Sequence, residues 1–150
     1  MPFPDACVLD ASVLVKLFLP EEHAAIATAL VRGVSDEGAS ARAIPDLALL
    51  ECGNVFWKRV RRGHLPADFA AESLADLLAL PLVVWPTREL AERALQLALP
   101  FDVSMYDAAY LALADTLDIP LVTADQAMAR KVGERGYGAD VRLLSDFADA

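Results

Sequence analysis

Four carboxylates lie in strongly apolar stretches of this 150-residue chain. Asp10 ends the run CVLD, Asp125 directly follows LVTA, Asp107 lies in SMYDAAYLALA, and Glu51 lies in LALLECGNVFWK. An unpaired buried charge is costly, so four acids in such surroundings are unusual. Each could act locally instead, as a turn or helix-terminal residue or, for Glu51, as half of an ion pair.

The four acids fit one shared cation site better than four separate roles, because two follow strands and a third begins a helix. Oxygen ligands alone suit Mg²⁺ or Mn²⁺ and argue against Zn²⁺. Ser12 and Thr123 lie two residues from Asp10 and Asp125, where their hydroxyls could hold a metal-bound water. A helix cap for Ser12 and a strand-end role for Thr123 stay equally open.

Basic residues gather near the end of the stretch that carries Glu51. They are Lys58, Arg59, Arg61, Arg62 and His64. At helical spacing, Val55, Lys58 and Arg62 lie on the same face as Glu51. The spacing predicts a cationic track leading away from the acids and suited to a polyanion. The alternative is a favourable interaction of these bases with the helix dipole.

The elements that must position these side chains alternate between short apolar runs and helical stretches. The predicted strands are Ala6–Leu9, Ala43–Ile44, Leu82–Trp85, Leu121–Thr123 and Val141–Leu144. The predicted helices are Glu21–Arg32, Asp46–Arg62, Pro66–Leu80, Arg88–Leu99, Ser104–Leu117 and Asp125–Arg135. Ser12 and Thr87 are expected as helix caps, Pro100 as a helix stop and Val34–Ser40 as a loop. Strands apolar on both faces and separated by helices indicate one α/β domain over residues 1–150, with a parallel sheet covered on both sides.

Composition excludes several classes of protein. Hydrophobic residues make up 56% of the chain, which excludes disorder as the main state. The net charge of −9, from 22 acids and 13 bases, weighs moderately against general adhesion to nucleic acid. Cys7 and Cys52 have no metal-ligand spacing, and we expect both to be small buried residues in a reducing cytoplasm. No targeting or membrane segment is recognisable.

Four segments, VLDASVLVKLFLPEE, DLALLECGNVFWK, SMYDAAYLALA and IPLVTADQAMA, occur in this order. Together they resemble the PIN-domain ribonucleases, particularly the VapC toxins of toxin–antitoxin pairs, over Val8–Val132. The resemblance implies a three-layer α/β/α fold with a short, mostly parallel sheet, and an RNA endonuclease dependent on Mg²⁺ or Mn²⁺. It also implies a homodimer and a cognate antitoxin. The implied site residues are Asp10, Glu51, Asp107 and Asp125, with Ser12 and Thr123 in support.

The motifs contain no histidine base, so the expected nucleophile is a metal-bound water. Two other functions stay open at this point, a PIN-fold interaction module without activity and a Mg²⁺-dependent phosphatase. A haloacid-dehalogenase-like phosphatase would need a second Asp where this chain has Ser12. A response-regulator receiver would need an acidic pair at the first strand end, where the chain reads Asp10-Ala11-Ser12.

Overall fold

A computed structural model describes residues 1–32 and 41–148 of the chain, so the predicted loop Val34–Ser40 lies outside the described residues. Its sheet has five parallel strands in the order β3-β2-β1-β4-β5. The strands are β1 (Cys7–Leu9), β2 (Arg42–Pro45), β3 (Val83–Trp85), β4 (Leu121–Thr123) and β5 (Val141–Leu143). The strand order reverses between β1 and β4, and in open parallel sheets ligands bind at such a point, beyond the carboxyl ends of the strands.

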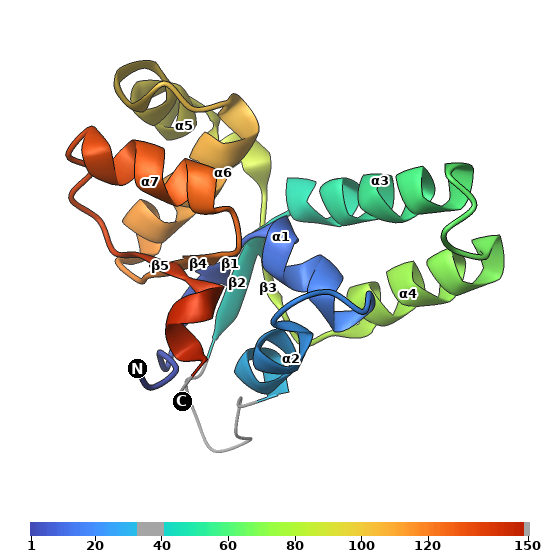
Figure 1. The fold of residues 1–150 in the computed structure, drawn as a ribbon. Coiled ribbons are helices and arrows are strands. Elements are labelled where there is room, and N and C mark those ends of the chain that lie inside the picture. Colours follow the sequence, from blue (N-terminus) through green and yellow to red (C-terminus); the bar gives the residue numbers. More distant parts are fainter. Residues whose placement is uncertain (33–40, 149–150) are drawn as a thin grey trace.

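Helices cover both faces of this sheet. They are α1 (Ala11–Leu14), α2 (Ala24–Arg32), α3 (Leu47–Arg61), α4 (Ala67–Ala79), α5 (Thr87–Phe101), α6 (Met105–Leu117) and α7 (Gln126–Glu134), with short 3₁₀ turns η1 (Val15–Leu17) and η2 (Leu144–Phe147). Figure 1 shows α1 to α4 on one side of the strands and α5 to α7 on the other. This arrangement confirms the three-layer α/β/α prediction.

The centre of the core is formed by β1, β4 and α6. Every residue of β1 and β4 is buried, as are the seven consecutive α6 residues from Ala108 to Ala114. A helix that is apolar all round is a buried helix, and its many alanines allow close approach to the strands. The two strands that carry Asp10 and Asp125 are therefore held firmly. No helix among the described residues is long and apolar enough to cross a membrane.

The strand Leu121–Thr123 was predicted with its observed bounds, but the prediction of full burial is wrong for β3. Val83 and Val84 are 46% and 47% exposed. β3 lies at the edge of the sheet and pairs only with β2 among the described strands. The apolar run of β3 therefore belongs to an edge strand. The apolar pattern predicts a strand but does not show whether other strands flank it on both sides.

Three predicted helix ends differ from the structure. Asp10, not Ser12, caps α1, with Oδ1 accepting from the Ser12 backbone N–H at 3.1 Å. Thr87 is not the cap of α5 but its first residue, since the N-cap position is Pro86, and the Thr87 N–H donates to Asp46 Oδ1, 41 residues away, at 3.0 Å. α2 begins at Ala24, three residues later than predicted, because His23 directly before it has left-handed backbone (φ 64°), which a right-handed helix cannot include.

Pro100 does not stop α5 as predicted. The helix continues through Pro100 to Phe101 and ends at Asp102, which has left-handed backbone (φ 55°) and donates its N–H to the carbonyl of Ala98. A proline near the last turn removes only one helical hydrogen bond, so it can be accommodated where the helix is about to end.

Candidate active site

All four predicted carboxylates line one pocket at the carboxyl ends of β1 and β4. The pocket has a volume of about 330 Å³. Its lining residues are Asp10, Ala11, Ser12, Val15, Glu51, Asn54, Val55, Lys58, Asp107 and Asp125. The acids reach it from β1, α3, α6 and the turn after β4, so residues up to 115 positions apart (Asp10 to Asp125) share one cavity.

Asp10 is the most deeply buried of the four, with 7% of its surface exposed. Its Oδ2 accepts a 2.6 Å hydrogen bond from the Thr123 hydroxyl, and its Oδ1 accepts from the Ser12 N–H. Burial raises the pKa of Asp10 above its ordinary value, and the negative charge of Asp125 adds to this rise. The hydrogen bonds from Thr123 and Ser12 oppose it by stabilising the charged form.

Ser12 and Thr123 connect the turns after β1 and β4. The Ser12 hydroxyl accepts from the Ala124 N–H at 2.9 Å and lies 3.4 Å from Thr123 Oγ1. Thr123 Oγ1 also accepts from the Asp125 N–H at 3.0 Å, and Asp125 Oδ1 in turn caps α7 by accepting from Met128 N–H. The two hydroxyls therefore act on the carboxylates and on the backbone that carries them.

Glu51 is fixed by a residue that the sequence analysis did not identify. The Tyr110 hydroxyl donates a 2.7 Å hydrogen bond to Glu51 Oε1. Burial is the main cause that raises the pKa of Glu51, and the charges of Asp10 and Asp107 raise it further, while the Tyr110 hydrogen bond lowers it. Tyr110 lies three residues after Asp107, a helical spacing that could have identified it.

Asp107 completes the cluster from the first turn of α6. Its backbone N–H donates to the Ser104 hydroxyl, so the helix cap is Ser104 and the Asp107 carboxylate is left for the pocket. Burial, followed by the charges of Asp10 and Asp125, raises the pKa of Asp107. The raised pKa values of Asp10, Glu51 and Asp107 share one origin, since each acid loses water and faces other acids.

The donor set suits a hard divalent cation, because it offers carboxylate oxygens and no thiolate or imidazole. A cation would relieve both the mutual repulsion and the desolvation that raise these pKa values. Over residues 1–32 and 41–148, no three His, Cys, Asp or Glu side chains already stand close enough to form a metal site. The suitability of the pocket for a divalent cation therefore rests on its carboxylate oxygens and on their location in one cavity.

The four predicted RNA-binding residues are not brought together. Lys58 lines the acidic pocket itself, so the predicted cationic track begins at the acids. Arg59 is paired with Glu21, and the Arg61 guanidinium stacks over the Trp57 ring at 4.8 Å. Arg62 lies exposed at the end of α3. Successive helical residues point about 100° apart, so neighbouring bases on one helix serve different contacts.

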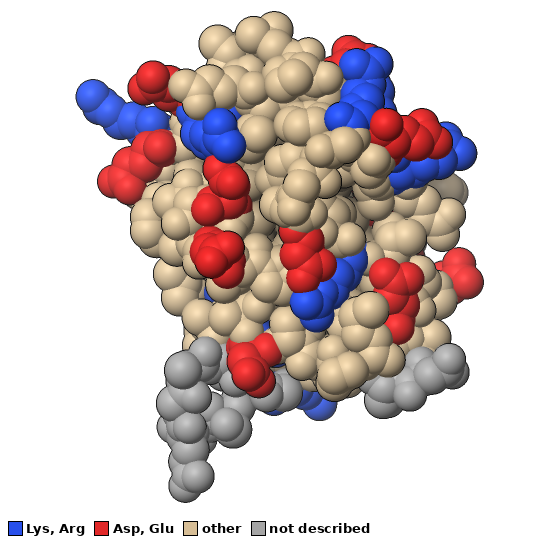
Figure 2. Space-filling view, turned by 90° about the vertical axis from the view of Figure 1, so that its left-hand side faces the viewer, with Lys and Arg blue, Asp and Glu red and all other residues tan. Residues whose placement is uncertain are grey.

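The sequence analysis also missed Asn54, whose exposed side chain lines the pocket. Asn54 lies three residues after Glu51 on α3, so helical spacing alone places it on the same face. The expectation that Cys7 and Cys52 are buried is confirmed, and both are free thiols in the described structure. The side of the molecule that lies at the left of Figure 1, where α5 and α7 are, carries scattered charges of both signs with wide uncharged areas between them (Figure 2).

Comparison with known proteins shows the family to which the chain belongs. The PIN domain family model matches residues 7–134, which include all four acids. The chain belongs to the PIN domain family. It is 39% identical to Ribonuclease VapC3 of Pyrobaculum aerophilum over 126 residues, 83% of this chain and 92% of the relative. It is 30% identical to Ribonuclease VapC12 of Mycobacterium tuberculosis over 138 residues, 92% of this chain and 98% of the relative.

The crystal structure of PAE2754 from Pyrobaculum aerophilum has a similar fold, with a TM-score of 0.69 and 24% sequence identity. The superposition covers 95% of this PIN-domain chain and 85% of that protein. The expected resemblance to VapC-like PIN-domain proteins is confirmed by the family match and the relatives. The predicted fold class is confirmed by the parallel sheet and its two helical layers.

Proposed function

We propose that this PIN-domain chain is a Mg²⁺-dependent endoribonuclease and the toxin of a toxin–antitoxin pair. The observation that carries the proposal is the convergence of Asp10, Glu51, Asp107 and Asp125 on one pocket that also contains Lys58. Relatives named ribonuclease VapC support RNA as the substrate. When bound, Mg²⁺ or Mn²⁺ would lower the pKa of a water molecule and offset charge on the phosphate that it attacks.

The residues of the site have two roles: some would bind the cation, and others hold these ligands in place. Asp10, Glu51, Asp107 and Asp125 would hold the cation, since their oxygens face one cavity. A second tier of side chains holds the acids in place: the Thr123 hydroxyl and the Ser12 N–H fix Asp10, and the Tyr110 hydroxyl fixes Glu51. Such outer contacts orient ligands whose own side chains would otherwise rotate or repel one another.

Lys58 is the basic residue best placed to meet the RNA backbone. It lines the acidic pocket from α3, where its ammonium can attract a phosphate that the carboxylates alone would repel. Arg62 lies one helical turn further along the same helix and extends the cationic track. Arg59 and Arg61 remain part of the proposed RNA surface, with their contacts to Glu21 and Trp57 giving way to phosphate.

A cognate antitoxin, a homodimer and a cytoplasmic location complete the proposal. The first two rest on the resemblance to VapC toxins. The location follows from an RNA substrate and is supported by the two free, buried thiols. Co-expression with the protein encoded by the neighbouring reading frame should relieve growth inhibition, and light scattering of the purified chain should give twice the mass of one copy.

Purified protein incubated with structured RNA tests the activity. We expect cleavage in Mg²⁺ that leaves 5′-phosphate and 3′-hydroxyl ends, no cleavage in EDTA, and none by Asp10→Asn, which removes an anionic ligand. Asp118→Asn, an exposed acid at the end of α6, is the matched control and should cleave normally. Folded wild-type protein that releases phosphate only from small phosphomonoesters would be a phosphatase, and one with neither activity would be an interaction module.

A further inference from the structure

A second pocket lies beside the acidic one and shares its walls. Val15 lines the acidic pocket, and the next residue, Lys16, lines the second. On the other wall Asp125 lines the acidic pocket, while Ala124 and Gln126 on either side of it line the second. A polymer bound in the acidic pocket would therefore place its next monomer at the opening of the second pocket.

The size of this second pocket suits one small ring system. Its volume is about 80 Å³. A single water needs about 10–15 Å³ on this measure, so the pocket holds the equivalent of about five to eight such spheres. A pyrimidine, with six ring atoms, falls in this range and a purine, with nine, slightly exceeds it, whereas a nucleotide with its sugar and phosphate would have to extend outside the pocket.

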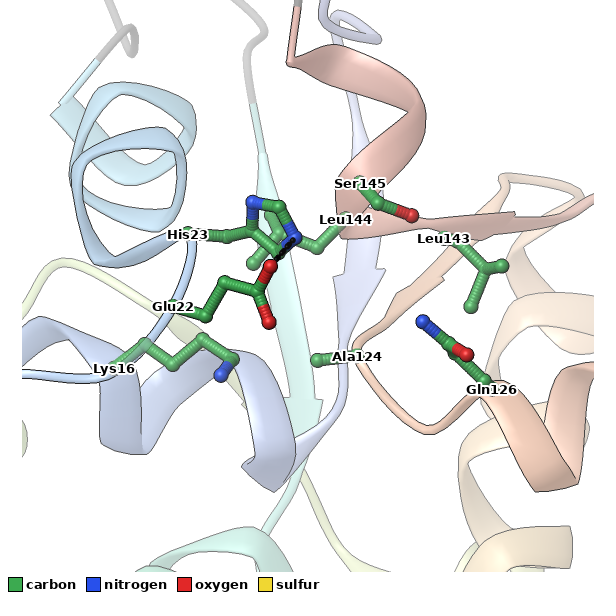
Figure 3. A pocket seen from close by; sticks show the side chains of 8 residues that line it. All are labelled: Lys16, Glu22, His23, Ala124, Gln126, Leu143, Leu144 and Ser145. Atoms are coloured by element: carbon green, nitrogen blue, oxygen red, sulfur yellow. Dashed lines mark ion pairs between the residues drawn. The ribbon is translucent and has the colours of Figure 1, made fainter.

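The lining offers the chemistry that a nucleobase requires. Figure 3 shows the Gln126 amide, the Ser145 hydroxyl and the His23 imidazole around a floor that includes Ala124 and Leu143. Apolar groups can pack on the flat faces of a base, and an amide and a hydroxyl can pair with donors and acceptors on its edge. Unstacked bases of single-stranded RNA are recognised by such a combination of packing and edge contacts.

His23 lies directly before α2 and its side chain lines the pocket. Its backbone is left-handed (φ 64°), a conformation that is uncommon for non-glycine residues although less so for His. Its Nε2 lies 3.5 Å from Glu22 Oε1, an ion pair drawn in Figure 3, and Glu22 is 85% exposed in its side chain. Glu22 can therefore turn outward, leaving the imidazole face free to stack on a base.

We propose that this pocket binds one nucleobase of the RNA next to the cleaved bond and so sets the base preference of cleavage. The inference rests on the proposed function. Lys16 lines this pocket and directly follows Val15 of the acidic pocket. Its side chain is 13% exposed and pairs with Glu21 at 3.2 Å, and its ammonium would face the phosphate that links the two nucleotides. Gln126 and Ser145 would read the base edge, and neither belongs to the acidic site.

The main test compares cleavage positions in a pool of RNAs with randomised sequence, read by sequencing the new 5′ ends. The variants are Gln126→Met, which keeps the length of the side chain without its amide, and Ser145→Ala. Gln96→Met, an exposed position on α5, is the matched control. We expect wild type and control to prefer one base at a fixed position beside the cut, and each pocket variant to lose about tenfold of that preference, the worth of one hydrogen bond.

Binding measurements separate this inference from the proposed function. Four homopolymeric pentanucleotides are titrated against Asp107→Asn protein, which we expect not to cleave them, with and without the two pocket substitutions. Discrimination among the four RNAs that falls in the pocket variants but not in Gln96→Met supports the inference, whether or not the wild type cleaves RNA. Thermal melts of each variant establish that it is folded.

Two results would overturn the nucleobase pocket while leaving the nuclease proposal in place. One is wild-type cleavage without any base preference beside the cut. The other is an unchanged preference in both pocket variants, even where their overall rate is lower. Absence of cleavage by the wild type would overturn the nuclease proposal alone, and equal binding of the pentanucleotides by pocket variants and control would then reject the pocket as well.

Discussion

The Tyr110 hydroxyl donates a 2.7 Å hydrogen bond to Glu51 Oε1 and so joins α6 to α3 next to the acidic pocket, which Glu51 lines. Tyr110 is fully buried. Burial is the main cause that raises the pKa of Tyr110, and the hydrogen bond adds to that rise because it holds the phenol proton. The same bond opposes the burial that raises the pKa of Glu51, because it stabilises the carboxylate. This one hydrogen bond therefore orients a carboxylate of the candidate site and connects it to a residue of the core.

Tyr110→Phe should lower the free energy of unfolding by about 1–2 kcal/mol, because a half-buried carboxylate loses its donor. It should also raise the pKa of Glu51 further. Urea unfolding at neutral pH measures the first effect and carboxyl NMR titration the second. Tyr106→Phe, 65% exposed and one turn away, is the control and should change neither. Equal stability of Tyr110→Phe and wild type would show that the contact is not maintained in solution.

Thr123→Val should cost about 1.5–3 kcal/mol of stability, since the hydroxyl both donates to the buried Asp10 carboxylate and accepts from the Asp125 N–H. Loss of this support should also lower the RNA cleavage rate about 10–100-fold, the usual effect of removing an outer contact to a metal ligand. Thr116→Val removes a hydroxyl bonded only to the Ala112 carbonyl and should leave cleavage unchanged. A Thr123→Val protein with full activity would argue against this role.

Metal-free protein should lose stability as the pH rises above the ordinary carboxyl range. The pKa values of Asp10, Glu51 and Asp107 are raised above 3.8, 4.5 and 3.8, so the folded chain keeps protons that the unfolded chain has released. The contribution of these acids to the free energy of unfolding therefore falls from about pH 4 upward, through the raised pKa values. Urea unfolding in EDTA from pH 4 to 8 should show a smaller fall in Asp107→Asn than in wild type.

Mg²⁺ should stabilise the wild type and have less effect on Asp107→Asn. At tenfold excess over its dissociation constant, Mg²⁺ adds about 1.4 kcal/mol, or about 3–6 °C in Tm. In EDTA, Asp107→Asn should melt above the wild type, because one repelling charge has gone. Asp118→Asn, on the same helix, should keep the full Mg²⁺ response. A variant that melts lower in EDTA yet responds like the wild type would indicate four separate acids instead of one site.

Lys58→Met should weaken RNA binding and reduce the salt dependence by about one unit of slope, as expected when one phosphate contact is lost. Arg61→Ala with Arg62→Ala should reduce it by about one unit for each contact made. Arg130→Met, on the exposed face of α7, is the control and should leave the slope unchanged. Identical slopes for Lys58→Met and wild type would exclude Lys58 from the RNA path.

The sequence by itself determined the types of the four acids, the order of strands and helices, and the parallel sheet. These follow from local rules, because the apolar period of a strand or helix and the breakers around it are written in neighbouring residues. The placement of Asp10 and Asp125 also followed, since parallel strands bring their carboxyl ends to one edge. The same reasoning was wrong for β3 at the sheet edge and for the end of α5 at Pro100.

The sequence named Ser12 and Thr123 as supporting residues, but only the tertiary structure decided which acid each supporting side chain contacts, added Tyr110 to them, and showed which bases face the acids. Thr123 reaches Asp10 across 113 residues, Tyr110 reaches Glu51 across 59, and Asp46 takes the capping role expected of Thr87 across 41. No local period encodes such contacts, because they depend on how helices pack on the sheet. For the same reason Lys58 enters the pocket while Arg59, one residue on and about 100° around the helix, pairs with Glu21 instead.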